Sequence, residues 1–204
     1  MMLHTRIAAP AVLEDTVLRA MFAARKSVFV DLLKWQVPVI DGQYEIDQFD
    51  NDHAVYLVVA GPCGRHLASA RLLPTLRPHI LGDLYPELCE VTPVRSAQVF
   101  EITRFCLDRA LNAGERRQAR NQLVQALASH ALEHGITTYV AIAEMGWFQQ
   151  ILAFGWRCRP LGMAQRVGPD LLIAFRIEID AATPAGLAAA GIRADALQLS
   201  SIAA

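Results

Sequence analysis

The sequence predicts a single-domain α/β fold in which a mixed central sheet lies between layers of helices. Three observations predict it. Segments with helical spacing of apolar residues alternate with short segments rich in strand-forming residues, 204 residues is the length of one ordinary domain, and no internal repeat is evident. We expect the domain to span residues 1–180 and an alanine-rich tail, either a frayed helix or disordered, to span 181–204.

Hydrophobic spacing and turn residues predict the elements of the first third of the chain. Apolar residues recur every three or four positions within residues 11–33, which indicates an amphipathic helix. A proline, a glycine and five carboxylates then interrupt the pattern, so residues 34–52 are expected to form a loop. Two stretches rich in β-forming residues, 53–60 and 66–73, flank the turn sequence Gly-Pro-Cys-Gly and predict a hairpin.

Helices and strands alternate through the rest of the chain, which favours a mixed sheet covered by helices on both faces. The expected elements are a short helix near residues 80–88, a strand at 98–107, a long helix at 115–133, a strand at 137–143, a helix at 145–154 and a last strand at 170–179.

Composition excludes several classes of protein. Although 53% of the residues are hydrophobic, the apolar runs are far shorter than the roughly 20 residues of a membrane-spanning helix. Glu14 and Asp15 interrupt the region where a signal peptide would be apolar, so we expect a cytoplasmic protein. A net charge of −1 gives no general attraction to nucleic acid or membranes. The four cysteines lack zinc-knuckle or disulfide spacing, and Cys106 is expected to be a buried, unreactive thiol.

A dense group of carboxylates, Glu45, Asp47 and Asp50, lies within six residues. Such a density of negative charge requires a cation. A metal is disfavoured, because the segment lacks the further Asp, Asn and Gly positions of a calcium loop and has no histidine directly beside it. Taken alone, the segment would be interpreted as a solvated acidic loop, and we predict no metal site.

Charged residues also lie inside otherwise apolar strands, at Arg71, Glu101 and Arg104. A charge in a central strand destabilises the fold unless it is paired. We therefore predict a lattice of ion pairs that fastens the acidic loop to the sheet. Its expected members are Arg71, Glu101 and Arg104 from the strands, with Asp47, Asp50 and Arg25.

Together these residues resemble the signature of the acyl-homoserine-lactone synthase family. The matching positions are Arg25, Phe29 and Trp35, then Glu45, Asp47 and Asp50, then Ala-Arg-Leu-Leu-Pro-Thr at 70–75, then Glu101, Arg104 and Phe105. Separate motifs in the right order make the resemblance specific. It implies an N-acetyltransferase-like fold and a quorum-sensing signal as product. It also implies two substrates and no cofactor: S-adenosylmethionine, which leaves as methylthioadenosine, and an acyl thioester of coenzyme A or of acyl carrier protein.

The resemblance also implies roles for individual residues. Glu101 is the candidate general base for the substrate amine, and its alternative role is an ion pair with Arg71 or Arg104. The expected catalytic residues are Glu101, Arg104, Asp47, Asp50 and Arg71. The expected substrate-binding residues are Arg25, Phe29, Trp35, Glu45, Phe105, Ala141, Ala143 and Trp147.

The resemblance makes two expectations about the acyl substrate. Family members that use 3-oxo chains often have threonine in the strand that here holds Ala141 and Ala143, so we expect an acyl group without a 3-oxo substituent. The chain should lie in an apolar tunnel near Phe105 and the helix at 145–154, which Trp147 could shorten.

Four arginines surround the start of the long predicted helix: Arg109, Arg116, Arg117 and Arg120. They are candidates for binding phosphate of coenzyme A or of phosphopantetheine. Alternatively, Arg116, Arg117 and Arg120 form only a solvated helical face. Gln149, Gln150 and Ala153 stand where family members that use acyl carrier protein tend to have basic residues, which weakens the carrier-protein assignment.

Two other functions remain open at this point. One is an acyl-coenzyme A N-acyltransferase of the same fold acting on another amine, although no convincing glycine-rich pyrophosphate loop occurs near residues 109–120. The other is a module that senses the signal without making it. It would have no need of Glu101 in the sheet, and the sequence has no basic helix pair for DNA binding.

Overall fold

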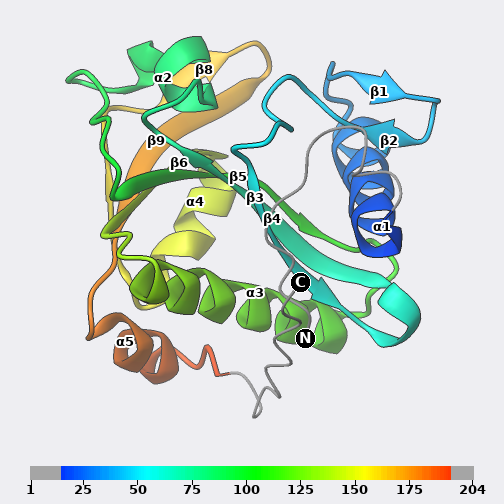
Figure 1. Cartoon of the computed structure of the whole chain (residues 1–204). Helices are drawn as coiled ribbons and strands as arrows, with labels where there is room; N and C mark the ends of the chain where they lie inside the picture. Colours follow the sequence, from blue (N-terminus) through cyan, green and yellow to red (C-terminus); the bar gives the residue numbers. More distant parts are fainter. Residues whose placement is uncertain (1–14, 194–204) are drawn as a thin grey trace. The chain divides into compact units, whose positions relative to one another are not determined.

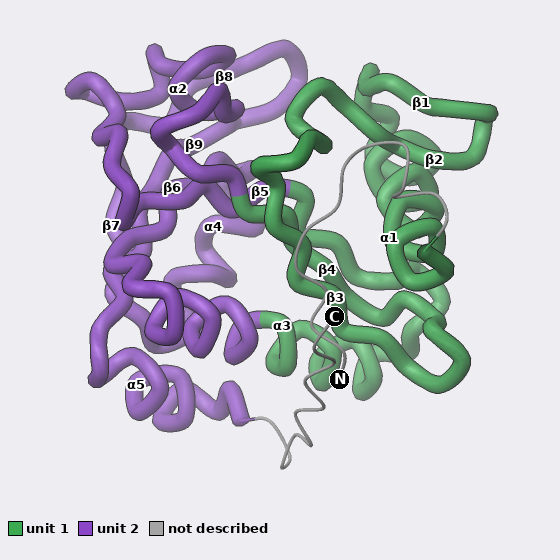
Figure 2. The backbone as a smooth tube through the Cα atoms, in the orientation of Figure 1, with its two compact units in different colours: residues 1–72, 104–123, 194–204 green, residues 73–103, 124–193 purple. Residues whose placement is uncertain are grey.

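The computed structural model describes residues 15–193, which form two compact units. Unit 1 contains the described residues 15–72 and 104–123, and unit 2 contains residues 73–103 and 124–193 (Figures 1 and 2). Strand β5 (Val99–Leu107) and helix α3 (Ala113–Glu133) each run from one unit into the other.

Unit 1 begins with helix α1 (Thr16–Arg25), which continues as the π-helix η2 (Lys26–Leu32). The Asp15 carboxylate accepts hydrogen bonds from the first free N–H groups of α1, as an N-cap residue should. The predicted helix is therefore confirmed from residue 16 onward, and its residues 11–14 lie outside the described part. The π-helical turns were not predicted; such segments are frequent at functional sites.

The expected loop at 34–52 contains a small hairpin of strands β1 (Val39–Ile40) and β2 (Tyr44–Glu45), so that prediction was incomplete. The turn between the strands contains Asp41 and Gly42, whose φ angles of 52° and 65° lie in the left-handed region. An Asp-Gly pair is a hairpin signal in the sequence, but the flanking strands are too short to show alternation.

The predicted hairpin that follows is confirmed. Strand β3 (Val55–Ala60) pairs antiparallel with β4 (His66–Pro74), and the turn contains the short 3-10 helix η3 (Pro62–Gly64). In unit 1 the strand order is β3-β4-β5. The pairing sets Tyr56 opposite Arg71, which places both side chains on the same face of the hairpin.

Unit 2 contains most of the mixed sheet. Its remaining elements are α2 (Ile80–Leu84), η4 (Pro86–Leu88), β6 (Thr138–Glu144), α4 (Met145–Leu152), β7 (Arg157–Pro160), β8 (Gln165–Val167), β9 (Asp170–Glu178) and α5 (Thr183–Ala189). The strand order is β5-β6-β9-β7, and β8 also pairs with β9. Only the β5–β6 pair of these is parallel, so the predicted mixed α/β fold is confirmed.

Two strands of unit 2 were not predicted. Strand β7 has two arginines and a proline in four residues, and β8 has three residues, so neither shows an alternating pattern. Part of the predicted tail is ordered as α5, where a Cβ on Gly155 would lie 2.3 Å from the carbonyl oxygen of Gly186. Residues 194–204 of that tail lie outside the described part. Within residues 15–193, no helix is both long and apolar enough to cross a membrane.

Helices cover both faces of the sheet in unit 2 (Figure 1). Under α2 and η4, Val140 packs in a cluster with Leu81 and Leu88. The next residue of β6, Ala141, must face the opposite side because side chains alternate along a strand. Its register partner Phe175 packs there against Phe148 of α4, with ring centroids 5.0 Å apart.

Candidate functional site

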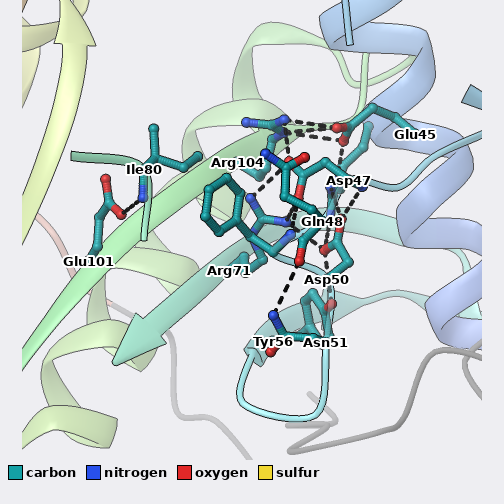
Figure 3. A network of polar contacts seen from close by, with 12 residues as sticks. Glu45, Asp47, Gln48, Asp50, Asn51, Tyr56, Arg71, Ile80, Glu101 and Arg104 are labelled. Atoms are coloured by element: carbon teal, nitrogen blue, oxygen red, sulfur yellow. Dashed lines mark hydrogen bonds and ion pairs between the residues drawn. The ribbon is translucent and has the colours of Figure 1, made fainter. Parts of the chain in front are cut away.

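A network of six charged side chains in unit 1 forms the candidate site (Figure 3). At its base, Arg25 donates from Nε to Glu45 at 2.6 Å and from both Nη atoms to the two Asp50 oxygens at 2.8 Å. Arg25 lies at the end of α1, and Glu45 in the small hairpin. The network therefore joins this helix to the acidic segment.

Two strand arginines complete the network. Arg71 in β4 lies 2.7 Å from Asp47 and 2.8 Å from Asp50. Arg104 in β5 lies 2.6 Å from Asp47 and 2.9 Å from Glu45. Three arginines thus neutralise three carboxylates, and each carboxylate contacts two arginines. The predicted lattice is confirmed for these residues, and Glu45 is an additional member.

Tyr56 also belongs to the network, although this was not predicted from the sequence. Its hydroxyl group donates to Asp50 Oδ1 at 2.9 Å from the strand opposite Arg71. Burial and the neighbouring negative charge of Asp50 raise the pKa of Tyr56, so the hydroxyl stays a donor. A tyrosine in an apolar strand gives no signal of this partner; only the β3–β4 register, combined with the position of Arg71, could have indicated it.

The pKa of the buried Asp50 carboxyl group is strongly perturbed. Burial alone would raise its pKa, but the charges of Arg25 and Arg71 overcome that effect and hold the pKa of Asp50 well below its usual range. Opposed effects act on Arg25, whose pKa is raised because Asp50 and Glu45 outweigh its burial. Asp50 and Arg25 therefore stay ionised throughout the physiological pH range.

The lowered pKa of Asp50 predicts sensitivity to acid. A depressed carboxyl pKa contributes stability that is fully present above the unfolded-state pKa of about 4 and is lost as the pH falls below it. We expect the free energy of unfolding to fall steeply below about pH 4, with a shallower slope in Asp50→Asn. Urea denaturation across this range checks it, and equal slopes in both proteins would contradict it.

Arg104 has an unusual backbone conformation. Its φ of 52° lies in the left-handed region, which is unfavourable for a residue with a side chain and is often found at functional sites. The guanidinium group lies 5.5 Å from the ring centroid of Phe29 and 5.6 Å from that of Trp35. Phe29 and Trp35 stack with centroids 4.8 Å apart, and Trp35 remains 39% exposed. The partly exposed Trp35 ring, backed by the buried Phe29, thus lies beside the charged network.

Glu101 belongs to unit 2, on the face of the sheet covered by α2. Its carboxylate accepts hydrogen bonds from the backbone N–H group of Ile80 at 2.7 Å (Figure 3) and from that of Leu81 at 2.9 Å. The side chain is buried. These backbone partners were not predicted, because nothing in the sequence shows which N–H groups lie opposite a strand carboxylate.

The residues expected to contact the acyl chain are divided between the units. Phe105 is half-buried in unit 1. Ala141 and Ala143 are buried in unit 2 on the face of β6 that α4 covers, opposite to the face of Glu101. Trp147 of α4 is half-buried, and its ring meets that of Phe154 edge-on at 6.0 Å.

The four arginines near the start of α3 lie in unit 1. Arg109, Arg116 and Arg117 are exposed, and Arg120 is half-buried beside Asn121, to which it donates at 2.9 Å. Burial and the neighbouring charge of Arg117 lower the pKa of Arg120.

A capping box that was not predicted closes the start of the same helix. The Asn112 side chain accepts from the Glu115 N–H at 3.0 Å, and Glu115 accepts from the Asn112 N–H at 2.9 Å. The Asn-x-x-Glu spacing could have indicated it. The N–H groups of Asn112 and Glu115 are therefore already bonded.

Comparison with known proteins identifies the family of this chain. A family model described as autoinducer synthase matches residues 10–186. The chain belongs to the autoinducer synthase family. This autoinducer synthase is 31% identical over 186 residues to an acyl-homoserine-lactone synthase of Ralstonia nicotianae, in an alignment that covers 88% of this chain and 90% of the relative. It is therefore an acyltransferase of the acyl-homoserine-lactone synthase class.

Solved structures agree with the family. The CoA-dependent synthase MesI has a TM-score of 0.81 at 28% identity, covering 98% of this chain and 99% of MesI. BjaI, solved with SAM and isopentyl-CoA, has a TM-score of 0.80 at 26% identity, covering 96% of each chain. An N-acetyltransferase from Lactobacillus plantarum, described as putative, is 17% identical with a TM-score of 0.55, covering 81% and 94%, and shows only the shared fold.

Proposed function

We propose that this autoinducer synthase transfers an acyl group from an acyl thioester to the α-amino group of S-adenosylmethionine and closes the product to a homoserine lactone. The observation that carries the proposal is the neutral network of three arginines and three carboxylates beside the partly exposed Trp35 ring, which stacks on Phe29. S-adenosylmethionine has a sulfonium, an adenine and a carboxylate, which suit an aromatic surface with a nearby arginine. SAM is also one of the two ligands named for BjaI.

The charged residues of unit 1 differ in what they can contribute. Arg25 is 1% exposed and uses all three of its guanidinium nitrogens on Glu45 and Asp50, so we assign it to holding the acidic segment rather than to binding substrate. Arg104 lies against the partly exposed ring of Trp35 and is the better candidate for the substrate carboxylate.

The chemistry requires two bonds to form. The uncharged amine attacks the thioester carbonyl carbon, the C–S bond breaks, and the amine proton passes through a base to the departing thiolate. Glu101 is the proposed base, directly or through one water molecule. The carboxylate oxygen then attacks the carbon attached to the sulfonium. The electrons of this carbon–sulfonium bond go to sulfur, and methylthioadenosine leaves. Because this second step is intramolecular, orientation alone can provide most of its acceleration.

We propose coenzyme A as the acyl carrier, with Arg109, Arg116, Arg117 and Arg120 as the candidate phosphate-binding residues. The support is their gathering at the start of α3, with Arg116 and Arg117 exposed. A panel of acyl-CoA and acyl carrier protein thioesters tests the donor. A clear preference for the carrier protein would contradict the assignment. We place the reaction in the cytoplasm, where these thioesters are made.

We also propose that the acyl chain lacks a 3-oxo group. Ala141 and Ala143 line one face of β6 with methyl groups only, so they offer no hydroxyl group to a ketone. Ala141→Thr and Ala143→Thr test this directly, and each should shift the ratio of kcat/KM toward 3-oxoacyl thioesters. A wild-type preference for 3-oxo chains would overturn the proposal.

Trp35→Ala should weaken S-adenosylmethionine binding. Loss of a cation–π contact of roughly 0.5–2 kcal/mol raises the Kd about 2- to 30-fold, while the KM for the acyl thioester stays unchanged. Leu32→Ala is the matched control, because Leu32 is 50% exposed nearby in sequence. Isothermal titration calorimetry checks the expectation. An unchanged Kd in Trp35→Ala would show that this ring does not contact the substrate.

A further inference from the structure

We propose that the start of α2 with its N-cap residue His79 (residues 79–83, called the turn below) positions the carboxylate of Glu101, and that His79 and Asp83 are positioning residues for the reaction. The proposal rests on the proposed function, since it concerns the group assigned there as general base. All of the residues involved lie in unit 2.

The turn holds Glu101 through its backbone. The N–H groups of Ile80 and Leu81 donate to Oε2 and Oε1, one to each oxygen, at 2.7 and 2.9 Å. Because each carboxylate oxygen has its own donor, both the position and the orientation of the carboxylate plane are fixed. The direction in which its remaining lone pairs point is therefore set by where the turn lies.

The position of the turn is fixed in its own right. The His79 N–H donates to Asp83 Oδ2 at 2.6 Å, and the Asp83 N–H donates to the His79 carbonyl at 3.1 Å. Arg95 holds the other Asp83 oxygen at 2.8 Å. Before the turn, Thr75 is bonded to the Val99 carbonyl through its N–H and its hydroxyl group, at 3.2 and 2.9 Å. The segment is thus attached to β5 at Val99 as well as at Glu101.

The His79 ring packs beneath the turn. It is fully buried, and its Nδ1 lies 2.9 Å from the Arg77 carbonyl oxygen, so Nδ1 carries the hydrogen because a carbonyl only accepts. A Cβ on Gly82 would lie 2.6 Å from both Cε1 and Nε2 of the ring. Only glycine fits here without moving either the ring or the turn.

This packing gives a sharp test. In Gly82→Ala the new methyl group collides with a ring that is buried and held, so the turn must shift relative to Glu101. A misplacement of about 1 Å lowers rate about 100-fold, so we expect kcat to fall about 10- to 100-fold, with KM for both substrates unchanged within about twofold. Gly61→Ala is the matched control, since the atoms nearest to its Cβ belong to the flexible Leu67 side chain, at 3.4 Å or more.

The double variant His79→Asn, Gly82→Ala tests the mechanism. Asparagine keeps a donor near the position of Nδ1 and removes the ring atoms that the methyl group would strike, so the double variant should recover much of the lost kcat. Asp83→Asn, which weakens the bonds to His79 and Arg95 without adding volume, should lower kcat in the same way and serves if Gly82→Ala fails to fold.

Hydrogen exchange gives a readout that does not depend on turnover. The Ile80 and Leu81 amides should exchange faster in Gly82→Ala than in the wild type or in Gly61→Ala. Unchanged kcat, or unchanged exchange at both amides, would overturn this proposal alone. Failure of the unsubstituted protein to make any lactone would overturn the proposed function, and this proposal with it.

Discussion

Asp50→Asn is expected to lower the free energy of unfolding by about 3–5 kcal/mol, because it removes one charge from a buried network and leaves the others uncompensated. Asp50 accepts from both Nη atoms of Arg25, lies 2.8 Å from Arg71 and accepts from Tyr56. Its side chain is 2% exposed, so water cannot replace these partners. Urea denaturation at neutral pH measures the change.

Asp31→Asn is the control for that experiment. Asp31 pairs with Lys26 at 2.9 Å, but the two side chains are 42% and 28% exposed. Exposed pairs contribute at most about 1 kcal/mol, so the control should differ little from the wild type. If Asp50→Asn lost no more stability than Asp31→Asn, the network would not hold the acidic segment in place.

Glu101→Gln is expected to lower kcat about 100- to 10,000-fold, since a carboxylate base is replaced by an amide that cannot take a proton. The variant should stay folded. The Gln carbonyl can still accept one of the two N–H bonds from Ile80 and Leu81, and the other is lost. Single-turnover assays alongside thermal unfolding separate the two effects.

Glu144→Gln is the matched control, because Glu144 also accepts a backbone N–H, from Gly146 at 3.0 Å, but is exposed at the start of α4. It should retain full activity. Near-normal kcat in Glu101→Gln would show that Glu101 only anchors the turn. A variant that loses its fold would indicate the same scaffold role.

Sequence reasoning located the charged network because charges in apolar strands require partners. Arg71 and Arg104 pointed to the acidic segment, and the structure pairs them with Asp47. The sequence could not predict which carboxylate pairs with which arginine. Glu45 bridges Arg25 and Arg104, which are 79 residues apart along the chain, and only the folded backbone decides such a contact.

The missed elements share a physical cause. Strands β1 and β2 have two residues each, and β7 exposes two arginines at the sheet edge, so none of them shows the alternation that identifies a half-buried strand. The hairpin β3–β4, by contrast, has long apolar strands around a strong turn sequence and was predicted closely. The short helix near residues 80–88 was predicted, but its contact with Glu101 was not, because backbone N–H groups make that contact.

Mass spectrometry of the products made from S-adenosylmethionine and an acyl thioester tests the central claim most directly. The purified full chain is incubated with each thioester of the panel, and lactone and methylthioadenosine are quantified together. The account predicts an acyl-homoserine lactone without a 3-oxo group, formed with one methylthioadenosine per lactone. If no thioester gives a lactone while another amine becomes acylated, the protein is an N-acyltransferase of the same fold and the account is wrong.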